Sequence, residues 1–268
     1  MKSLIGDIFV EYQVMGEGQP ILILGKHMMK SLEPIFDMKP GWKRIYINYP
    51  GIGNTKVTDD IKTSDDILSV IIEFIDKIIG TEKFLLAGFS YSSYLARGVI
   101  YKRPELIKGL LMICPVIVAD SSQRNIENNT MVFRDHKFIS TLAESELEDL
   151  QPFVIHDKNI WDKAQDLNKE TENLADMIFF NRLKQNGWYS FSFEVDYLKS
   201  PFNEPTLILL GRQDSIVGYK DVFKIADNFP RASIVILDMA GHNLNIEQEK
   251  LFNTLVLEWL GRIDQLIS

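Results

Sequence analysis

The chain has little of what marks a secreted or membrane protein. Cys114 is its one cysteine among 268 residues, so no disulfide can form within the chain, which fits a reducing compartment. No apolar run approaches the length that spans a bilayer. The N-terminal residues carry a lysine but no apolar stretch of signal-peptide length. We therefore expect a cytoplasmic protein. The apolar run around Cys114 predicts that this residue is buried in a strand and is not a reactive thiol.

Basic residues are also fewer than acidic ones. The chain has 29 lysines and arginines against 37 acidic residues, which gives a formal net charge of −8. An acidic chain repels phosphate backbones and anionic lipid headgroups, so we expect neither nucleic acid nor a membrane as a partner. The hydrophobic content of 46% suffices for one large core with a modest insertion. A homodimer is one of the states that this composition allows.

Short apolar runs alternate with stretches of helical spacing along most of the chain. The runs typical of buried strands are 8–14, 20–24, 43–48, 84–87, 106–114, 206–210 and 232–237. Helices are expected over 64–79, from Ser90 to 103, over 219–228 and within 244–266. Ser64, Asp65 and Asp66 are expected to cap the first of them. Strands that alternate with helices predict an α/β fold, with a mostly parallel central sheet and helices on both faces.

The pattern changes between Ala119 and Ser200. This stretch has no clear buried strand and is dense in charged and amide residues, and its helical spacing lies over 141–150 and 160–183. The sequence therefore predicts two parts. Residues 1–118 and 201–268 form the core, and residues 119–200 form a helical cap inserted between two strands.

The most informative motif is Gly88-Phe89-Ser90-Tyr91-Ser92, between a predicted strand and a predicted helix. Turning from strand to helix in so few residues crowds the backbone, so small residues are needed beside the turn. Ser90 then lies at the N-terminus of a helix, where N–H groups and the helix dipole face any developing negative charge. The flanking elements favour Ser90 as a nucleophile over a serine that caps the helix.

A serine nucleophile needs a base and an acid that orients the base. His242 follows the last predicted strand, and the carboxyl ends of parallel strands share one edge of a sheet with Ser90. Asp214 follows the strand before it and is the preferred acid. Asp238 lies only four residues from His242 and is poorly placed to brace it from behind, and Asp120 is a weaker alternative.

The other histidines have less specific settings. His136 and His156 lie in the predicted insertion, where surface positions are expected. His27 follows the strand over 20–24, so it is expected in a loop near the site. The pair Gly51 and Gly53 lacks a third glycine at a strand-to-helix turn, which argues against a dinucleotide site.

The order Ser90, Asp214, His242, with an insertion after the fifth core strand, resembles the α/β-hydrolase superfamily, in its serine-nucleophile, cap-containing form. The resemblance covers nearly the whole chain. The motifs that carry it are Gly88-Phe89-Ser90-Tyr91-Ser92, Gly211-Arg212-Gln213-Asp214, Gly241-His242 and Asn48-Tyr49-Pro50-Gly51-Ile52-Gly53, the last being similar to the family's Asp-x-Pro-Gly-x-Gly turn. Ser92 stands where the commonest form of the elbow has glycine.

The resemblance implies an oxyanion hole, formed by the N–H of Tyr91 and an N–H from the loop after residues 20–24. Most relatives have His-Gly-x in that loop, whereas this chain has Gly25-Lys26-His27-Met28. His27 is expected to supply the second N–H, and Met28 takes that role if the strand ends differ by one residue. Loss of one such donor costs about 10²–10³ in rate.

The resemblance implies a serine hydrolase that acts on a small-molecule ester or related acyl compound through an acyl-enzyme, without a metal or organic cofactor. Two other chemistries of the superfamily stay open, namely carbon–carbon bond hydrolysis of ring-opened diketones and removal of an N-terminal residue from a small peptide. The peptidase alternative depends on acidic cap residues, for which the candidates are Glu144, Glu146, Glu148, Asp149, Glu170, Glu172 and Asp176. A catalytically silent ligand-binding member is an alternative of another class. Aromatic residues expected either to line the pocket or to pack the cap are Trp161, Phe179, Phe180, Trp188, Tyr189, Phe191 and Phe193.

Overall fold

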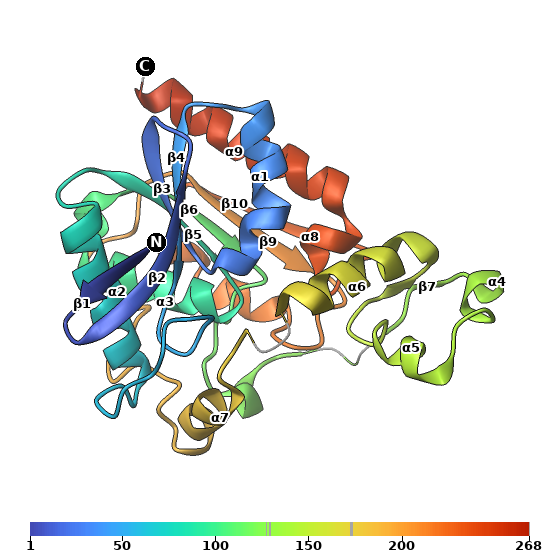
Figure 1. Cartoon of the computed structure of the whole chain (residues 1–268). Helices are drawn as coiled ribbons and strands as arrows, with labels where there is room; N and C mark the ends of the chain where they lie inside the picture. Colours follow the sequence, from blue (N-terminus) through green and yellow to red (C-terminus); the bar gives the residue numbers. More distant parts are fainter. Residues whose placement is uncertain (127, 129, 172–173, 268) are drawn as a thin grey trace.

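An eight-stranded sheet forms the centre of the molecule (Figure 1). The computed structural model describes residues 1–126, 128, 130–171 and 174–267. The strands are β1 (Lys2–Ile5), β2 (Ile8–Met15), β3 (Gln19–Leu24), β4 (Trp42–Asn48), β5 (Phe84–Phe89), β6 (Ile107–Ile113), β9 (Thr206–Gly211) and β10 (Ala232–Leu237). They lie in the order β1-β2-β4-β3-β5-β6-β9-β10. Strand β2 pairs antiparallel with β1 and β4, and β4 through β10 pair in parallel, so the predicted α/β fold is confirmed.

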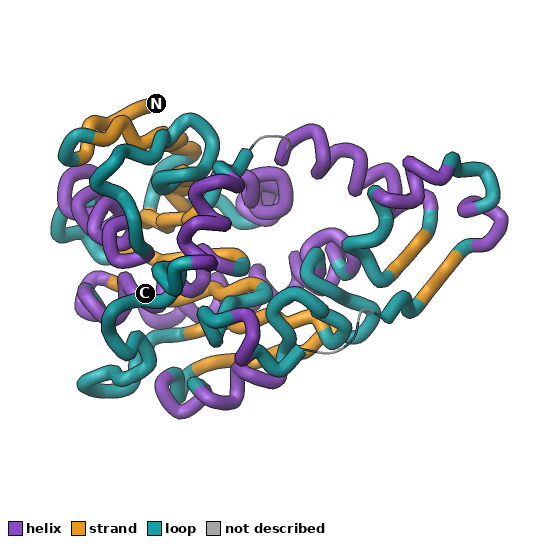
Figure 2. The backbone as a smooth tube through the Cα atoms, turned by 90° about the horizontal axis from the view of Figure 1, so that it is seen from below, coloured by secondary structure: helices purple, strands orange, loops and turns teal. Residues whose placement is uncertain are grey.

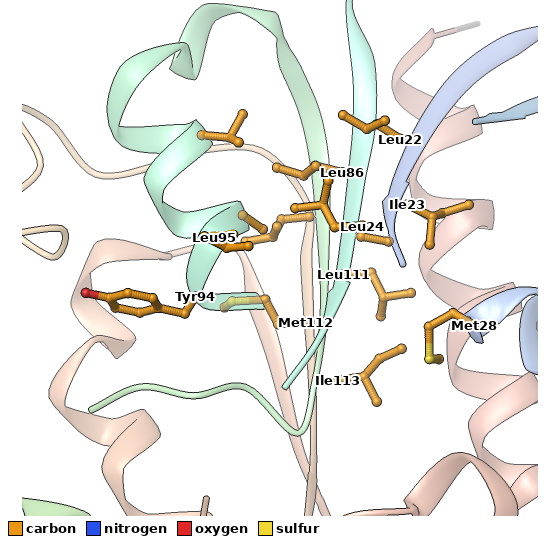
Figure 3. Packing of buried hydrophobic residues seen from close by; sticks show 14 of the residues in the cluster. Leu22, Ile23, Leu24, Met28, Leu86, Tyr94, Leu95, Leu111, Met112 and Ile113 are labelled. Carbon is orange, nitrogen blue, oxygen red and sulfur yellow. The ribbon is translucent and has the colours of Figure 1, made fainter. Parts of the chain in front are cut away.

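Helices cover both faces of this sheet because its central strands are apolar on both sides. On one face lie α1 (Met29–Met38) and α9 (Glu249–Ile267), and on the other lie α2 (Ser64–Ile78) and α3 (Tyr91–Lys102). Figure 3 shows Tyr94 and Leu95 of α3 on one side of the strands, with Ile23 and Met28 on the other. In the part of the chain that is described, no helix has the length and apolarity needed to cross a membrane.

The segment between β6 and β9 contains short elements, most of which extend away from the sheet (Figure 2). They are η3 (Ser121–Gln123), β7 (Phe133–Arg134), α4 (His136–Ile139), α5 (Glu144–Glu148), β8 (Ile155–His156), α6 (Lys158–Thr171) and α7 (Met177–Gln185). This segment has a small apolar cluster of its own, which includes Leu150, Phe153 and Ile160. Met239 and Ile246 of the C-terminal part pack against that cluster, so it is continuous with the carboxyl edge of the sheet.

Several predicted helices have other boundaries in the structure. The stretch 160–183 forms two helices, α6 and α7, because Asp176 starts a new one by accepting a hydrogen bond from the N–H of Phe179. The stretch 219–228 forms two 3₁₀ helices, η4 (Lys220–Lys224) and η5 (Ala226–Asn228), instead of one α-helix. The stretch 141–150 is helical only over α5.

The cap of α2 also differs from the prediction. Thr63 is the N-cap residue, and its hydroxyl and the carboxylate of Asp66 form a capping box. Ser64 is buried instead, and its hydroxyl contacts the hydroxyl of Tyr91 at 2.6 Å and the carbonyl of Tyr189 at 2.7 Å. The elements that were not predicted are β1, α1, α4, β7, β8 and the 3₁₀ helices η1 (Lys26–Met28), η2 (Pro104–Leu106) and η3. The predicted C-terminal stretch 244–266 is divided into α8 (Leu244–Glu247) and α9.

Candidate active site

Ser90 lies at a sharp turn between β5 and α3. Its φ is 54° and its ψ is −118°, a left-handed backbone conformation that a residue with a side chain rarely adopts. The turn is tight, since a Cβ on Gly88 would lie 2.6 Å from the carbonyl oxygen of Ser92. Backbone bonds hold the strained residue, because the N–H of Ser90 donates to Ile113 and its carbonyl accepts from Val116. Ser90 is half-buried, so it is not sealed beneath the surrounding side chains.

The structure brings Ser90, His242 and Asp214 together. His242 Nε2 lies 3.0 Å from Ser90 Oγ, and His242 Nδ1 lies 2.8 Å from Asp214 Oδ2. A carboxylate only accepts, so Nδ1 donates to Asp214, and Nε2 is the ring nitrogen that faces the serine hydroxyl. Asp214 is 1% exposed, and its Oδ1 accepts the N–H groups of Ile216 and Val217. Burial raises the pKa of Asp214, but the charge and hydrogen bond of His242 and these two N–H groups outweigh it and leave that pKa below its usual value.

The competing acids lie elsewhere. Asp238 accepts from Gln213 Nε2 at 2.8 Å, and Asp120 caps η3 by accepting the N–H of Ser122. Within the described residues, neither carboxylate contacts His242. Asp214 is therefore the carboxylate that the structure places beside the imidazole of His242.

The insertion carries two histidines, and neither contacts Ser90 within the described residues. His136 is exposed on α4, as expected. His156 is half-buried, and its Nε2 lies 3.0 Å from the carbonyl oxygen of Phe153. That contact gives His156 a local structural role.

The two predicted oxyanion donors follow the neighbouring parallel strands β3 and β5. Leu24 of β3 lies opposite Gly88 of β5 in the ladder, so the residues after Leu24 reach the same edge as Ser90. Tyr91 is the first residue of α3, and the first N–H groups of a helix have no carbonyl partner within it. His27 lies in η1, directly after Gly25 and Lys26.

The imidazole of His27 packs closely on Gly25. Gly25 has a φ of 124°, and a Cβ there would lie 2.8 Å from His27 Nδ1. That nitrogen is buried and has no hydrogen-bond partner among the described residues. Burial lowers the pKa of His27 to about 4, so the ring is neutral at pH 7. Its ring meets the ring of Phe89 edge to face, with 6.0 Å between centroids.

A polar network that the sequence analysis missed fixes the loop after β3. Glu11 on β2 accepts from Lys26 Nζ at 3.1 Å and from Asn48 Nδ2 at 2.7 Å, and it also bonds Asn54. Asn48 Oδ1 in turn accepts the N–H of Lys26 at 3.1 Å. Burial raises the pKa of Glu11, but these hydrogen bonds outweigh it and lower that pKa to about 2. The register of β2 and β4, which pairs Glu11 with Asn48, creates this site.

A second missed carboxylate holds the loop that carries His242. Glu247 on α8 is 8% exposed, and its Oε2 accepts the N–H of Gly241 at 2.6 Å. Burial raises the pKa of Glu247, and the nearby charge of Asp214 adds to the rise. Cys114 Sγ donates to the carbonyl of Gly241 at 3.7 Å, so both sides of this peptide group are used.

The donor set beside Asp214 does not suit a metal ion. The ligand atoms of Cys114, Asp214 and His242 lie within 4.8 Å of one another. However, the Cys114 thiol donates its proton to the carbonyl of Gly241, so its sulfur is already engaged. His242 Nδ1 also carries the proton that it gives to Asp214.

A cavity of about 150 Å³ lies beside the elbow. Its walls come from η1, α1, Phe89, α6, α8 and the first turn of α9. None of the seven aromatic residues that the sequence suggested lines it. Four of them pack into the main core instead, namely Phe179, Phe180, Tyr189 and Phe191. The cavity is therefore formed by residues of α1, α6 and α8 and not by these seven rings.

The acidic residues suggested for a peptidase do not line this cavity either, as far as they are described. Glu172 lies outside the described residues, as does the side chain of Glu170. The acidic groups that do line the cavity are Asp166 and Glu249, and each forms an ion pair with a lysine.

Comparison with known proteins identifies the family of this fold. The family model of the alpha/beta hydrolase fold matches residues 26–249. The chain is similar to the crystal structure of an alpha/beta superfamily hydrolase from Oenococcus oeni PSU-1, with a TM-score of 0.81 and 28% identity over 95% of this chain and 96% of that one. It is 20% identical to the putative carbamate hydrolase RutD of Agrobacterium fabrum over 75% of this chain and 74% of that protein. It is 23% identical to the pimeloyl-(acyl-carrier protein) methyl ester esterase of Legionella pneumophila over 91% of this chain and 96% of that protein. The chain belongs to the α/β-hydrolase family.

Proposed function

We propose that this chain is a serine hydrolase that cleaves a small-molecule ester or a related acyl compound. The observation that carries the proposal is the 3.0 Å hydrogen bond between Ser90 Oγ and His242 Nε2 at a strained elbow. A strained backbone conformation persists only where the surrounding structure holds it, and such residues cluster at active sites. Two relatives are named as an esterase and a carbamate hydrolase, and both names support attack on a carbonyl carbon.

The proposed reaction has two halves. His242 takes the proton of Ser90 as Oγ attacks the carbonyl carbon, and the N–H groups of Tyr91 and His27 stabilise the oxyanion. His242⁺ then gives the proton to the leaving alcohol, and Asp214 stabilises the imidazolium meanwhile. In the second half, water attacks the acyl-enzyme and gives a proton to His242. The bond between the acyl carbon and Ser90 Oγ then breaks, His242 returns the proton to Oγ, and the acid product leaves.

The insertion takes the role of a cap in this proposal. Residues 119–200 lie between β6 and β9, and α6 contributes one wall of the cavity beside the elbow. A wall from an inserted segment can exclude water and select substrates without changing the sheet that holds the reacting groups. Residues 1–118 and 201–268 supply every proposed catalytic side chain.

Covalent labelling tests the nucleophile. A fluorophosphonate should label the wild-type chain on the peptide that contains Ser90, as mass spectrometry of the digest will identify. Ser90→Ala should remove the label and reduce hydrolysis of p-nitrophenyl acetate at least about 10³-fold. Ser92→Ala is the matched control, because the Ser92 hydroxyl contacts Tyr49 and not His242, and it should keep the label.

Two results would contradict the proposal. Label on a residue other than Ser90 would assign the nucleophile elsewhere. A wild-type chain that neither reacts with the fluorophosphonate nor cleaves any aryl ester would support the silent, ligand-binding alternative. Amino-acid arylamides and a ring-opened diketone, tested beside the esters, separate the peptidase and carbon–carbon chemistries from ester hydrolysis.

A further inference from the structure

Arg97 is a buried cation that the proposed reaction does not use. It lies on α3, about two helical turns after Ser90, and only 2% of it is exposed. A buried guanidinium is costly unless its donors are satisfied. The partners of Arg97 therefore show which parts of the molecule hold it in place.

The partners of Arg97 lie at both ends of the segment between β6 and β9. Its Nη1 donates to the carbonyl of Val116 at 3.0 Å and to that of Ile117 at 3.1 Å. Its Nη2 donates to the carboxylate of Asp196 at 2.8 Å. Val116 and Ile117 come shortly after β6, and Asp196 comes shortly before β9. One side chain thus ties both ends of this segment to the helix that follows Ser90.

Val116 also contacts the backbone of Ser90. Its N–H donates to the carbonyl of Ser90 at 3.1 Å, while the N–H of Ser90 donates to the carbonyl of Ile113 at 2.8 Å. The left-handed conformation of Ser90 is therefore held by backbone bonds to residues 113–116. Cys114 in this stretch has a φ of 41°, so the stretch itself is in an unfavourable conformation and needs support. Arg97 supports it at the carbonyl of Val116.

The guanidinium of Arg97 is fixed by its two terminal nitrogens. Its Nε is buried and has no hydrogen-bond partner among the described residues. The ring of Tyr94, one turn earlier on α3, lies 5.3 Å from Arg97 Cζ and adds a cation–π contact. A lysine has a single nitrogen in place of this fork, so it cannot serve Val116 and Asp196 with the same geometry.

We propose that Arg97 is a positioning residue for the nucleophile, because it sets the backbone of Ser90 through Val116. This inference rests on the proposed serine hydrolase function, in which Ser90 Oγ attacks and the N–H of Tyr91 stabilises the oxyanion. Both groups belong to the turn that Val116 holds, so a shift of Val116 misplaces them together relative to His242. A misplacement of about 1 Å costs about 10²-fold in rate.

Substitution of Arg97 tests the assignment. Arg97→Met should lower kcat for p-nitrophenyl acetate about 30-fold or more and lower the rate of fluorophosphonate labelling by a similar factor. KM should change less than about threefold, because Arg97 acts on the reacting groups and does not line the cavity beside the elbow. Arg97→Lys keeps the charge and one donor, so its kcat should fall about fivefold, less than in Arg97→Met.

Asp196→Asn separates the two branches of the contact. It keeps an acceptor for Arg97 Nη2 and leaves the bonds to Val116 and Ile117 in place. Its kcat should therefore stay within about threefold of the wild type. A loss as large as that of Arg97→Met would mean that the charge pair, and not the support of Val116, sets the rate.

Arg44→Met is the matched control. Arg44 is also buried, pairs with the carboxylate of Glu33, donates to the carbonyl of Trp42 and lies over the ring of Phe36. These contacts join β4 to α1 and do not involve α3. Arg44→Met should lower the melting temperature as Arg97→Met does, with kcat close to that of the wild type.

Three further results would overturn the assignment. The first is an Arg97→Met variant with the kcat and labelling rate of the wild type. The second is an equal loss of kcat in Arg97→Met and Arg44→Met, which would leave Arg97 a role in stability alone. The third is a raised KM with unchanged kcat, which would place Arg97 at the substrate. If Arg97→Met does not fold, Arg97→Lys takes its place in these comparisons.

These outcomes are separate from the test of the nucleophile. In each of them the wild-type chain still carries the fluorophosphonate on Ser90, so the proposed function stands while the role of Arg97 fails. A wild-type chain that neither takes the label nor cleaves an ester overturns both.

Discussion

Glu247 and Val154 are 93 positions apart in the chain, yet Glu247 Oε1 accepts the N–H of Val154 at 2.6 Å. The other oxygen of the same carboxylate accepts the N–H of Gly241, the residue before His242. One buried side chain thus connects the insertion to the loop that carries the proposed base. We expect the position of the insertion and the orientation of His242 to depend on each other through Glu247.

Glu247→Gln should lower kcat more than it changes KM. An amide has one acceptor oxygen and an NH₂ group that faces a donor, so one of the two bonds is lost. We expect kcat to fall about tenfold or more and stability to fall by about 1–3 kcal/mol, since a buried N–H group is left unsatisfied. Steady-state kinetics and urea unfolding measure the two effects.

Glu33→Gln is the matched control for Glu247. Glu33 is also a hydrogen-bonded carboxylate, but its partners are the side chains of Arg44 and Tyr46. It should lower stability with kcat close to wild type. Equal losses of kcat in both variants would mean that Glu247 acts through general stability alone.

Gly25→Ala should impair the reaction through His27. The φ of Gly25 disfavours any side chain, and the new Cβ would displace the His27 ring and with it the N–H proposed for the oxyanion hole. Loss of one such donor lowers kcat about 10²–10³-fold. Far-UV circular dichroism should show a folded protein, and a folded variant with normal kcat would remove His27 from the oxyanion hole.

Asp214→Asn should leave the fold intact and lower kcat by about 10⁴-fold. The asparagine NH₂ group can donate to His242 Nδ1, which reverses the tautomer and puts the ring proton at Nε2, where the Ser90 hydroxyl must donate. KM should change little, because Asp214 is buried behind the imidazole. A variant that retains kcat within tenfold would contradict the role of Asp214.

The stability of the loop after β3 should depend on pH through Glu11. The folded state lowers the pKa of Glu11 from 4.5 to about 2, so its stabilisation is fully present above pH 4.5 and is lost as the pH falls toward 2. Glu11→Gln should therefore cost about 1–2 kcal/mol at pH 7 and less at pH 3.5. Chemical unfolding of both proteins at several pH values measures the difference. A gap that does not narrow toward low pH would contradict this role.

Much of the fold could be predicted because its central strands are continuous apolar runs that end at turn residues. The misses have physical causes. The edge strand β1 has only four residues and is mostly exposed, so it has no clear apolar pattern. Helix α1 contains Pro34 and has no capping side chain, although the spacing of Leu32, Ile35 and Phe36 offered a signal.

The juxtaposition of Ser90, Asp214 and His242 could be predicted because each of these residues follows a strand at the same edge of the sheet. Glu11 and Glu247 could not be found this way. Their partners are backbone N–H groups and amides from distant segments, such as Asn48 and Val154, and no local spacing encodes these pairings. The position of the cavity depends on the packing of α6 against α1 and α9. These contacts join distant parts of the chain, so local spacing does not encode them either.

The burial of Cys114 makes it a natural reporter of unfolding. The thiol is fully enclosed and held in protonated form by its raised pKa, so alkylating reagents have no access to a reactive sulfur while the sheet is intact. Cys114 is the chain's sole thiol, so the rate at which a maleimide modifies the protein reports how readily the central strands open. The unfolding of the sheet can thus be followed without introducing a label site.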